Sequence, residues 1–451
     1  MASLILARKE IQRRAALLPR EVNVWHEGAR ANVGGLGIHL SQFNALKLMM
    51  DGLWERQAAL LEELKPSLPA GEFADKYLSL TDEIVGAHDL WRIFRYIMAQ
   101  HADEALKQFI VAADHVAADC YRTCMNKARL WKLVREEELR EPPLVYLEAG
   151  ASPSTASRGM AAETLSLPLR RYRNMRLPIP IVLLPFDHAT SFWTLCNLYH
   201  EVGHNLDQDL KLRQELGDHL LTRMGQEGWL AERQQSWWKW GGEILADVFG
   251  VLLGGAGFAY SLCWWLLALA PAERFRELDS RDVHPPPYVR VHLIAALLRE
   301  SGSQELAQAA AAILAEWEAQ PKPDWVAPYL AEGAVVVDVF LNQKLTALGG
   351  ERTLRDFNDD LDGDAERVRQ VAACLPKNFN CPDPALIEFT PRLLPAAAQL
   401  ALSKLGEPTA ELLDKLQANA LAYFQRVPRP DFLAGAGREE FLRGLVRRVE
   451  F

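Results

Sequence analysis

Residues 200–204 read His200-Glu201-Val202-Gly203-His204. On an α-helix, two histidines at positions i and i+4 lie on one face, about one turn apart. Both imidazoles can therefore reach a single Zn²⁺ at about 2.0–2.1 Å. Glu201 lies off that face, where a general base can approach a metal-bound water without ligating the metal. The pentapeptide thus predicts a helix that binds a metal ion.

The residues around the pentapeptide agree with a helix that enters a packed core. Residues 177–185 form a short β-branched run bounded by prolines, which predicts a strand at a sheet edge, where Pro is tolerated. Thr190 or Ser191 is expected to cap the helix that follows. Gly203 costs about 1 kcal/mol relative to Ala inside a helix. That cost indicates that another element packs closely against this turn.

A tetrahedral catalytic zinc site needs a third protein ligand and one open position. The metzincin pattern fails, because Asp207 and Leu210 stand where a Gly and a His would follow His204. The segment Glu-Ile-Leu-Ala-Asp, from Glu243 to Asp247, instead offers two carboxylates one helical turn apart. We expect Glu243 to be the third ligand. We expect Asp247 to accept a hydrogen bond from the non-ligating nitrogen of a zinc histidine.

These two motifs together resemble the gluzincin clan of zinc metallopeptidases, in the branch whose second motif is Glu-x-x-Ala-Asp. Residues 284–290, His-Pro-Pro-Pro-Tyr-Val-Arg, are similar to a downstream segment of that branch, with an Arg six residues after the His. The resemblance extends over residues 177–295. It implies a mainly α (α+β) fold, in which a zincin-like core with a small sheet and an active-site helix is flanked by helical regions.

The resemblance also implies a function. It predicts a hydrolase that cleaves peptide bonds with one Zn²⁺ per chain, held by His200, His204 and Glu243, with Glu201 as the catalytic base. The expected substrate is a protein or a peptide, because that is what such enzymes cleave.

The downstream segment implies an electrophilic pair. In the branch, the matching side chains stabilise the oxyanion of the tetrahedral intermediate, and they correspond here to His284 and Arg290. Donors aimed at developing negative charge lower the barrier, so the assignment is chemically consistent. Tyr288 is a further candidate donor.

The chain of 451 residues is long enough for two or three domains. We expect a helical N-terminal region over residues 1–148, the metallopeptidase core over 149–305 and a helical C-terminal region over 306–451. The stretch 248–270 carries no charge and is long enough to span a bilayer. Because glycines interrupt it, we interpret it as a buried core helix, or two broken helices, and we do not expect it to contact a membrane.

Composition limits the class of binding partner and the cellular compartment that we expect for this protein. The net charge of −9 and the lack of a long basic run argue against a nucleic-acid partner. The N-terminus lacks the layout of a signal peptide, which favours a cytoplasmic protein. Cys120 and Cys124, one helical turn apart, are expected to be buried thiols.

Several other residues resemble binding or catalytic sites, but we expect them to have structural roles only. The acidic run 358–364 fails as a calcium loop, because Arg369 stands where the ligating Glu is needed, and it predicts a solvated turn. His188 and His219 are expected to be ordinary surface or core histidines. A tryptophan cluster before Glu243 is expected to pack in the core, and it comprises Trp229, Trp237, Trp238 and Trp240.

Two alternative functions stay open at this point. One is hydrolysis of a non-peptide amide by the same zinc site. The other is a catalytically silent zinc protein that serves as a helical scaffold or sensor. Within the peptidase hypothesis, the helical regions on both sides could restrict access to the metal, and the hypothesis therefore includes a regulatory protein partner that activates the enzyme.

Overall fold

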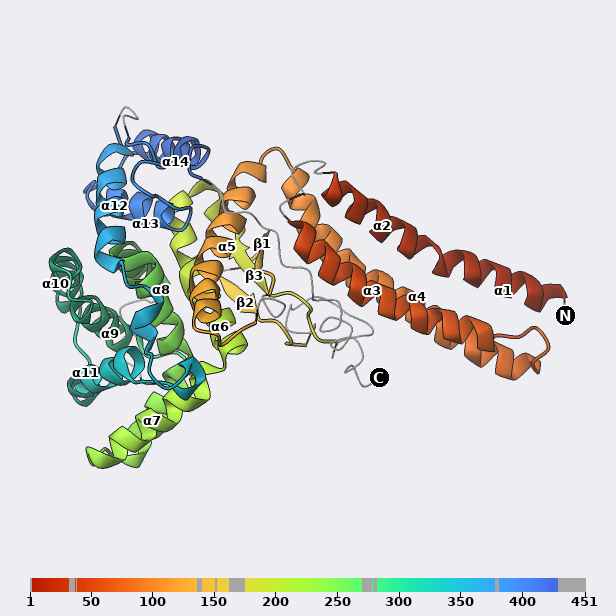
Figure 1. Cartoon of the computed structure of the whole chain (residues 1–451), viewed down its shortest axis with the longest axis horizontal. Coiled ribbons are helices and arrows are strands. Elements are labelled where there is room, and N and C mark those ends of the chain that lie inside the picture. The colour runs from red at the N-terminus through yellow and green to blue at the C-terminus, as the bar shows by residue number, and fades with distance from the viewer. Residues whose placement is uncertain are drawn as a thin grey trace.

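The computed structural model describes residues 2–31, 37, 39–135, 140–150, 152–161, 175–269, 278, 282–377 and 381–428. Within these ranges the protein is mainly helical, with one small three-stranded sheet near the middle of the molecule (Figure 1). The predicted mainly α class is confirmed at this coarse level.

The sheet contains strands β1 (Leu144–Glu148), β2 (Ser154–Ala156) and β3 (Ile181–Pro185), in the order β1-β3-β2. Strand β3 runs parallel to β1 and antiparallel to β2. The prediction that β3 lies at an edge was therefore wrong, because it is the central strand. The prolines at 178 and 180 precede the paired segment and Pro185 ends it, so the residues between them keep the N–H groups that a central strand needs.

Alternate side chains of the sheet enter two different cores. Val145 and Leu147 of β1 belong to the large core of the body. Leu144 and Tyr146 belong to a second core on the opposite face. This alternation follows from the two-residue period of a strand. The small sheet is thus buried on both sides.

The second core joins the sheet to a long helical arm, made of α1 (Ala2–Ala15), α2 (Leu17–Arg30), α3 (Leu40–Glu63) and α4 (Ala70–Ala99). The arm extends away from the body, with the N-terminus at its far end (Figure 1). After the short 3₁₀ helix η2 (Gln100–Ala102), α5 (Lys107–Leu130) returns the chain to the body and packs beside the sheet.

Helix α6 (Asn197–Leu210) carries the His-Glu-Val-Gly-His segment, and α7 (Leu212–Gln226) follows it. Two 3₁₀ segments, η5 (Phe186–Thr190) and η6 (Phe192–Cys196), precede α6. Ser191 is the N-cap residue of η6, which runs directly into α6, so the predicted position of the cap is confirmed but the side-chain hydrogen bond is not. The Thr190 hydroxyl instead donates to the carbonyl of Asp187, and the Ser191 side chain makes no cap hydrogen bond.

Helix α8 (Ala231–Leu269) runs through the body and is broken at Gly255, whose φ of 51° lies in the left-handed region that glycine tolerates. Among the described residues, α8 is the one helix long and apolar enough to cross a membrane, but most of its apolar stretch is buried inside the protein. The interpretation of two broken core helices is consistent with this burial. The backbone conformation of Gly255 kinks α8 within the core.

Further helices pack around α8 on the side away from the arm (Figure 1). They are α9 (Pro287–Glu300), α10 (Gln304–Glu318), α11 (Ala327–Asn342), α12 (Leu361–Cys374) and α13 (Leu393–Ser403). Helix α14 (Ala410–Phe424) packs outside them, against α13 and α5. Cys374 and Cys381 form a disulfide. Cys120 and Cys124 are buried free thiols, as predicted.

Candidate metal centre

Helices α6 and α8 approach each other at Gly203. A Cβ atom placed there would lie 2.9 Å from Cα of Ala246 and 3.1 Å from Cβ of Phe249. The prediction of a close neighbour at this turn is confirmed, and the neighbour is the helix that carries Glu243. Glycine at 203 therefore lets the two motif-bearing helices come into backbone contact.

Replacing Gly203 with alanine is expected to lower the free energy of unfolding by about 1–3 kcal/mol, which is typical of overpacking a core. The helix propensity gained is about 1 kcal/mol and does not offset a contact with backbone atoms. Urea unfolding measures the change. Gly225 of α7 is the control, because a Cβ there meets nothing within 4 Å. An equally stable Gly203→Ala protein would contradict the close approach.

Three ligand atoms converge where the helices meet. Nε2 of His200 lies 3.3 Å from Oε2 of Glu243, and Nε2 of His204 lies 3.4 Å from Oε1 of the same carboxylate. The two Nε2 atoms are 3.1 Å apart. Tetrahedral zinc with bonds of about 2.0–2.2 Å separates its ligand atoms by about 3.3–3.6 Å. The three spacings are close to the edges of such a tetrahedron.

The three side chains could hold a metal ion. Oε2 of Glu243 is buried and has no hydrogen-bond partner, which is costly for a carboxylate oxygen unless a cation or donor reaches it. Two imidazoles and one carboxylate are a donor set that suits Zn²⁺. His204 is the most accessible ligand, with 24 % of its side chain exposed. The residues present therefore fit a zinc ion with access from the His204 side.

Asp247 contacts the ring nitrogen of His200 that does not face the other ligands. Its Oδ1 lies 2.8 Å from Nδ1 of His200, which is the hydrogen bond predicted from the sequence. Arg290, on α9, donates from Nε to Oδ2 at 2.7 Å and from Nη2 to Oδ1 at 2.8 Å. Both Asp247 and Arg290 are 3 % exposed. Such a carboxylate fixes the imidazole tautomer and leaves Nε2 for the metal.

This geometry changes the role expected for Arg290. Its guanidinium is engaged by Asp247, and Nη2 stays 3.7 Å from Oε2 of Glu243. The structure therefore favours a positioning role for Arg290 over direct contact with an oxyanion.

His284 lies on the open side of the centre. Half of its side chain is exposed, and its Nε2 lies 3.5 Å from Oε2 of Glu243. Its Nδ1 lies 2.8 Å from Oδ1 of Asp282, which also accepts the His284 backbone N–H. Asp282 was missed in the sequence, although an acid two residues before the histidine was the available signal. Its carboxylate orients the ring with Nε2 towards the cluster.

Glu201 is buried beside the ligands, at 6 % exposure. Burial raises the pKa of its carboxyl group to about 7, and the neighbouring Glu243 charge adds to this, while His200 and Arg290 oppose it. A carboxyl group with a pKa near neutrality can both accept and return a proton at physiological pH.

The surroundings shift the pKa values of the three ligand side chains in different directions. Burial opposes a charge on His200, but the nearby carboxylates of Asp247 and Glu243 outweigh burial and raise its pKa to about 10. Burial and the His200 charge lower the pKa of His204 to about 4. Burial favours a neutral Glu243, yet His200 and Arg290 hold its pKa well below the usual range.

The remaining candidates lie elsewhere. The Tyr288 ring is buried, stacks on His292 and packs against Trp317, so it is a core residue. Trp237 and Trp240 are fully buried and Trp229 packs against the core, as predicted, whereas Trp238 is exposed, which the prediction had wrong. His188 is buried in η5, and His219 makes a surface contact with Glu215.

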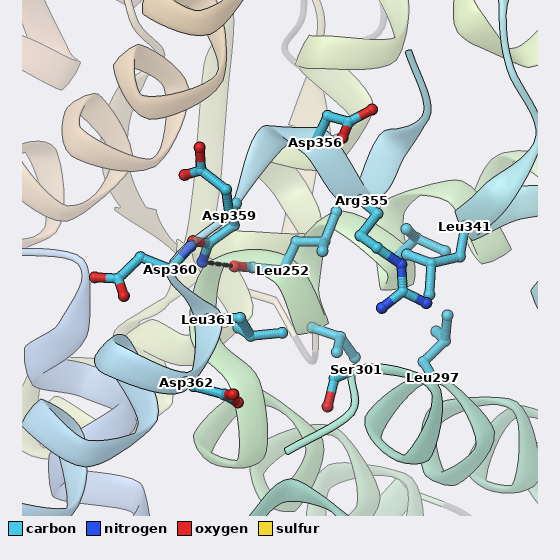
Figure 2. A pocket seen from close by; sticks show the side chains of 13 residues that line it. Leu252, Leu297, Ser301, Leu341, Arg355, Asp356, Asp359, Asp360, Leu361 and Asp362 are labelled. Carbon is cyan, nitrogen blue, oxygen red and sulfur yellow. Dashed lines mark hydrogen bonds between the residues drawn. The ribbon is translucent and has the colours of Figure 1, made fainter. Parts of the chain in front are cut away.

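The acidic run was predicted to be a solvated turn, but it is partly buried. Asn358 donates to the carbonyl of Leu252 at 2.7 Å, and Asp364 pairs with Arg392 at 2.6 Å. Figure 2 shows this segment beside a pocket whose other wall includes Leu252 and Leu297. The acidic run is therefore a partly buried turn that connects the start of α12 to α8.

Comparison with known proteins adds no relative: no family model, curated protein or solved structure matches this chain.

Proposed function

We propose that the protein is a zinc-dependent metallopeptidase. The observation that carries the proposal is the arrangement of His200, His204 and Glu243, whose ligand atoms lie 3.1–3.4 Å apart at the contact of two helices. Three protein ligands leave one position of a tetrahedral zinc open, which is the arrangement of catalytic rather than structural zinc sites.

Each side chain then has one task. Zinc bound by these ligands would lower the pKa of a water molecule towards 7 and polarise the scissile carbonyl. Glu201 accepts the proton of the attacking water and returns it to the leaving amine. Burial raises the pKa of its carboxyl group, which favours its role as a proton acceptor.

The polar groups around the ligands complete the site. Asp247, held by Arg290, keeps His200 in the tautomer that binds through Nε2. His284, half exposed and oriented by Asp282, lies where it can donate to a developing oxyanion. The substrate would be a protein or a peptide that reaches the centre from the side of His204 and His284.

Two alternatives share the same metal. A silent scaffold or sensor needs the three ligands but not a buried acid beside them, so Glu201 favours catalysis. Hydrolysis of a non-peptide amide uses the same chemistry and differs only in the substrate. A cytoplasmic location and a regulatory partner belong to the proposal and rest on sequence arguments alone, and the Cys374–Cys381 disulfide argues against a reducing compartment.

The zinc-loaded protein is expected to cleave members of an unbiased peptide library, with fragments identified by mass spectrometry. Chelation should abolish cleavage and added Zn²⁺ should restore it, because the ligands alone supply no Lewis acid. Cleavage of small acyl amides but no peptide would favour the first alternative. No cleavage of either class by the folded, zinc-loaded chain would favour the silent protein.

Cleavage of casein, which is unstructured, tests whether a regulatory partner is needed for activity. Rapid casein cleavage by the isolated protein would show that no partner is needed to open the site.

A further inference from the structure

A second cluster of metal-ligating side chains lies at the base of the helical arm, away from the α6–α8 contact. His39 stands at the start of α3, His101 lies in η2 after α4, and Asp114 lies on α5. One ligand atom from each lies within 4.8 Å of the other two. All three residues are 1–2 % exposed. Buried charged and polar groups of this kind need partners.

One carboxylate oxygen of this cluster is approached by both imidazoles. Oδ2 of Asp114 lies 2.5 Å from Nε2 of His101 and 3.3 Å from Nε2 of His39. The other oxygen, Oδ1, accepts the backbone N–H of Val145 in β1 at 2.9 Å. Asp114 is therefore fixed to the sheet while Oδ2 faces the two rings.

His101 is oriented as a metal ligand would be. Its Nδ1 lies 3.3 Å from the carbonyl oxygen of Ile97, which can accept an N–H but cannot donate one. With the proton on Nδ1, the lone pair of Nε2 faces Oδ2 of Asp114, which is itself an acceptor. A second proton fits the 2.5 Å separation, whereas a zinc ion bonded to both atoms would hold them about 3.3–3.6 Å apart, so the carboxylate would have to move by about 1 Å when the ion binds. A backbone carbonyl behind the ring is a common support for a ligating histidine.

His39 separates these two explanations. Both of its ring nitrogens are buried and neither has a hydrogen-bond partner, although Nε2 lies 3.3 Å from Asp114. The rings of His39 and His101 are nearly perpendicular, with centroids 4.4 Å apart. A proton between His101 and Asp114 would leave His39 unsatisfied, which is rare for a buried polar group. A metal ion bonded to all three residues would satisfy it.

We propose that His39, His101 and Asp114 form a second zinc site, closed to substrates by its burial, that fastens the helical arm to the body. The three ligands come from α3, η2 and α5, so one ion would join the two long helices of the arm to the helix beside the sheet. Two imidazoles and a carboxylate suit Zn²⁺, as at the first site. Because the ligands are almost fully buried, an enclosed water molecule would complete the coordination, and no substrate could reach it. This site does not depend on the proposed peptidase function.

The test counts zinc in the full chain by elemental analysis after exhaustive dialysis. The wild-type protein is expected to hold about two zinc ions per chain. The variant His204→Ala/Glu243→Ala lacks two ligands of the first site and is expected to retain one. Adding His39→Leu to that variant is expected to remove the remaining ion. A folded His204→Ala/Glu243→Ala protein without zinc would overturn the proposal.

The single variant His39→Leu gives an independent measurement. If the cluster binds no metal, leucine replaces a buried imidazole without a hydrogen bond and should leave the unfolding temperature unchanged or raised. If it binds zinc, the variant loses one ion per chain and loses part of the rise in unfolding temperature that added Zn²⁺ gives the wild type. Zinc content equal to the wild type would overturn the proposal, whatever the stability.

His115 provides the matched control. It is also a buried histidine of α5, next to Asp114, but it is not a member of the cluster. His115→Leu is expected to keep both zinc ions. If His39→Leu does not fold, the zinc count of His204→Ala/Glu243→Ala decides the question, because that variant leaves the arm and its three ligands intact.

Discussion

Glu201→Gln is expected to lower kcat/KM for peptide cleavage by about 10²–10⁴-fold, which is the usual contribution of a positioned acid–base group. Glutamine has nearly the same shape but can neither accept a proton from water nor return one to the leaving amine. Glu201 does not take part in the three-residue ligand group, so the zinc content of the variant should equal that of the wild type. Full turnover with bound zinc would remove Glu201 from the mechanism.

The control for this substitution is Glu232→Gln, at the exposed start of α8. It makes the same chemical change on the same pair of helices and should alter neither activity nor zinc content. If both variants lost activity equally, the loss would reflect a general sensitivity to charge and not proton transfer. Activity and elemental analysis on the same preparations separate the two outcomes.

The first metal centre could be read largely from the sequence, because its parts are local. His200 and His204 lie one turn apart on α6, and Glu243 and Asp247 lie one turn apart on α8. Helical periodicity alone orients each pair. Gly203 also indicated the close contact, since a glycine inside a helix has a cost that packing must justify. The crossing of the two helices, which sets the 3.3 Å spacing of His200 and Glu243, is a tertiary property.

Other features had no local signature. The cluster of His39, His101 and Asp114 had no motif, because α3 and α4 separate His39 from His101, and the 13 residues from His101 to Asp114 form no recognised ligand spacing. The order of the strands depends on β2, a three-residue strand in a stretch of small residues. The role of Arg290 could not be read from its motif either, because only the folded chain shows that Asp247 accepts both of its donors.

Arg290 and Asp247 form a buried ion pair that contributes in different ways to the free energy of unfolding and to zinc affinity, and substitutions are expected to distinguish the two contributions. Arg290→Met leaves the Asp247 carboxylate buried without its main partner, and Asp247→Leu leaves the guanidinium buried. Breaking such a pair typically costs about 3–5 kcal/mol, because the remaining charge is uncompensated. Each single variant is therefore expected to lose about that much unfolding free energy in urea, measured without metal.

The double variant Asp247→Leu/Arg290→Met is expected to recover most of that loss, since two apolar side chains replace both charges and neither is left alone. Its zinc affinity at the α6–α8 centre should nevertheless stay about 10–100-fold below that of the wild type, because His200 has lost the carboxylate that fixes its Nδ1 proton. A chromophoric chelator in competition measures this affinity. Arg369→Met, which breaks an exposed pair with Glu366, is the control and should change stability by less than about 1 kcal/mol. Full zinc affinity in the double variant would mean that Asp247 serves only to neutralise Arg290, and that the imidazole is positioned by the packing of α6 against α8 alone.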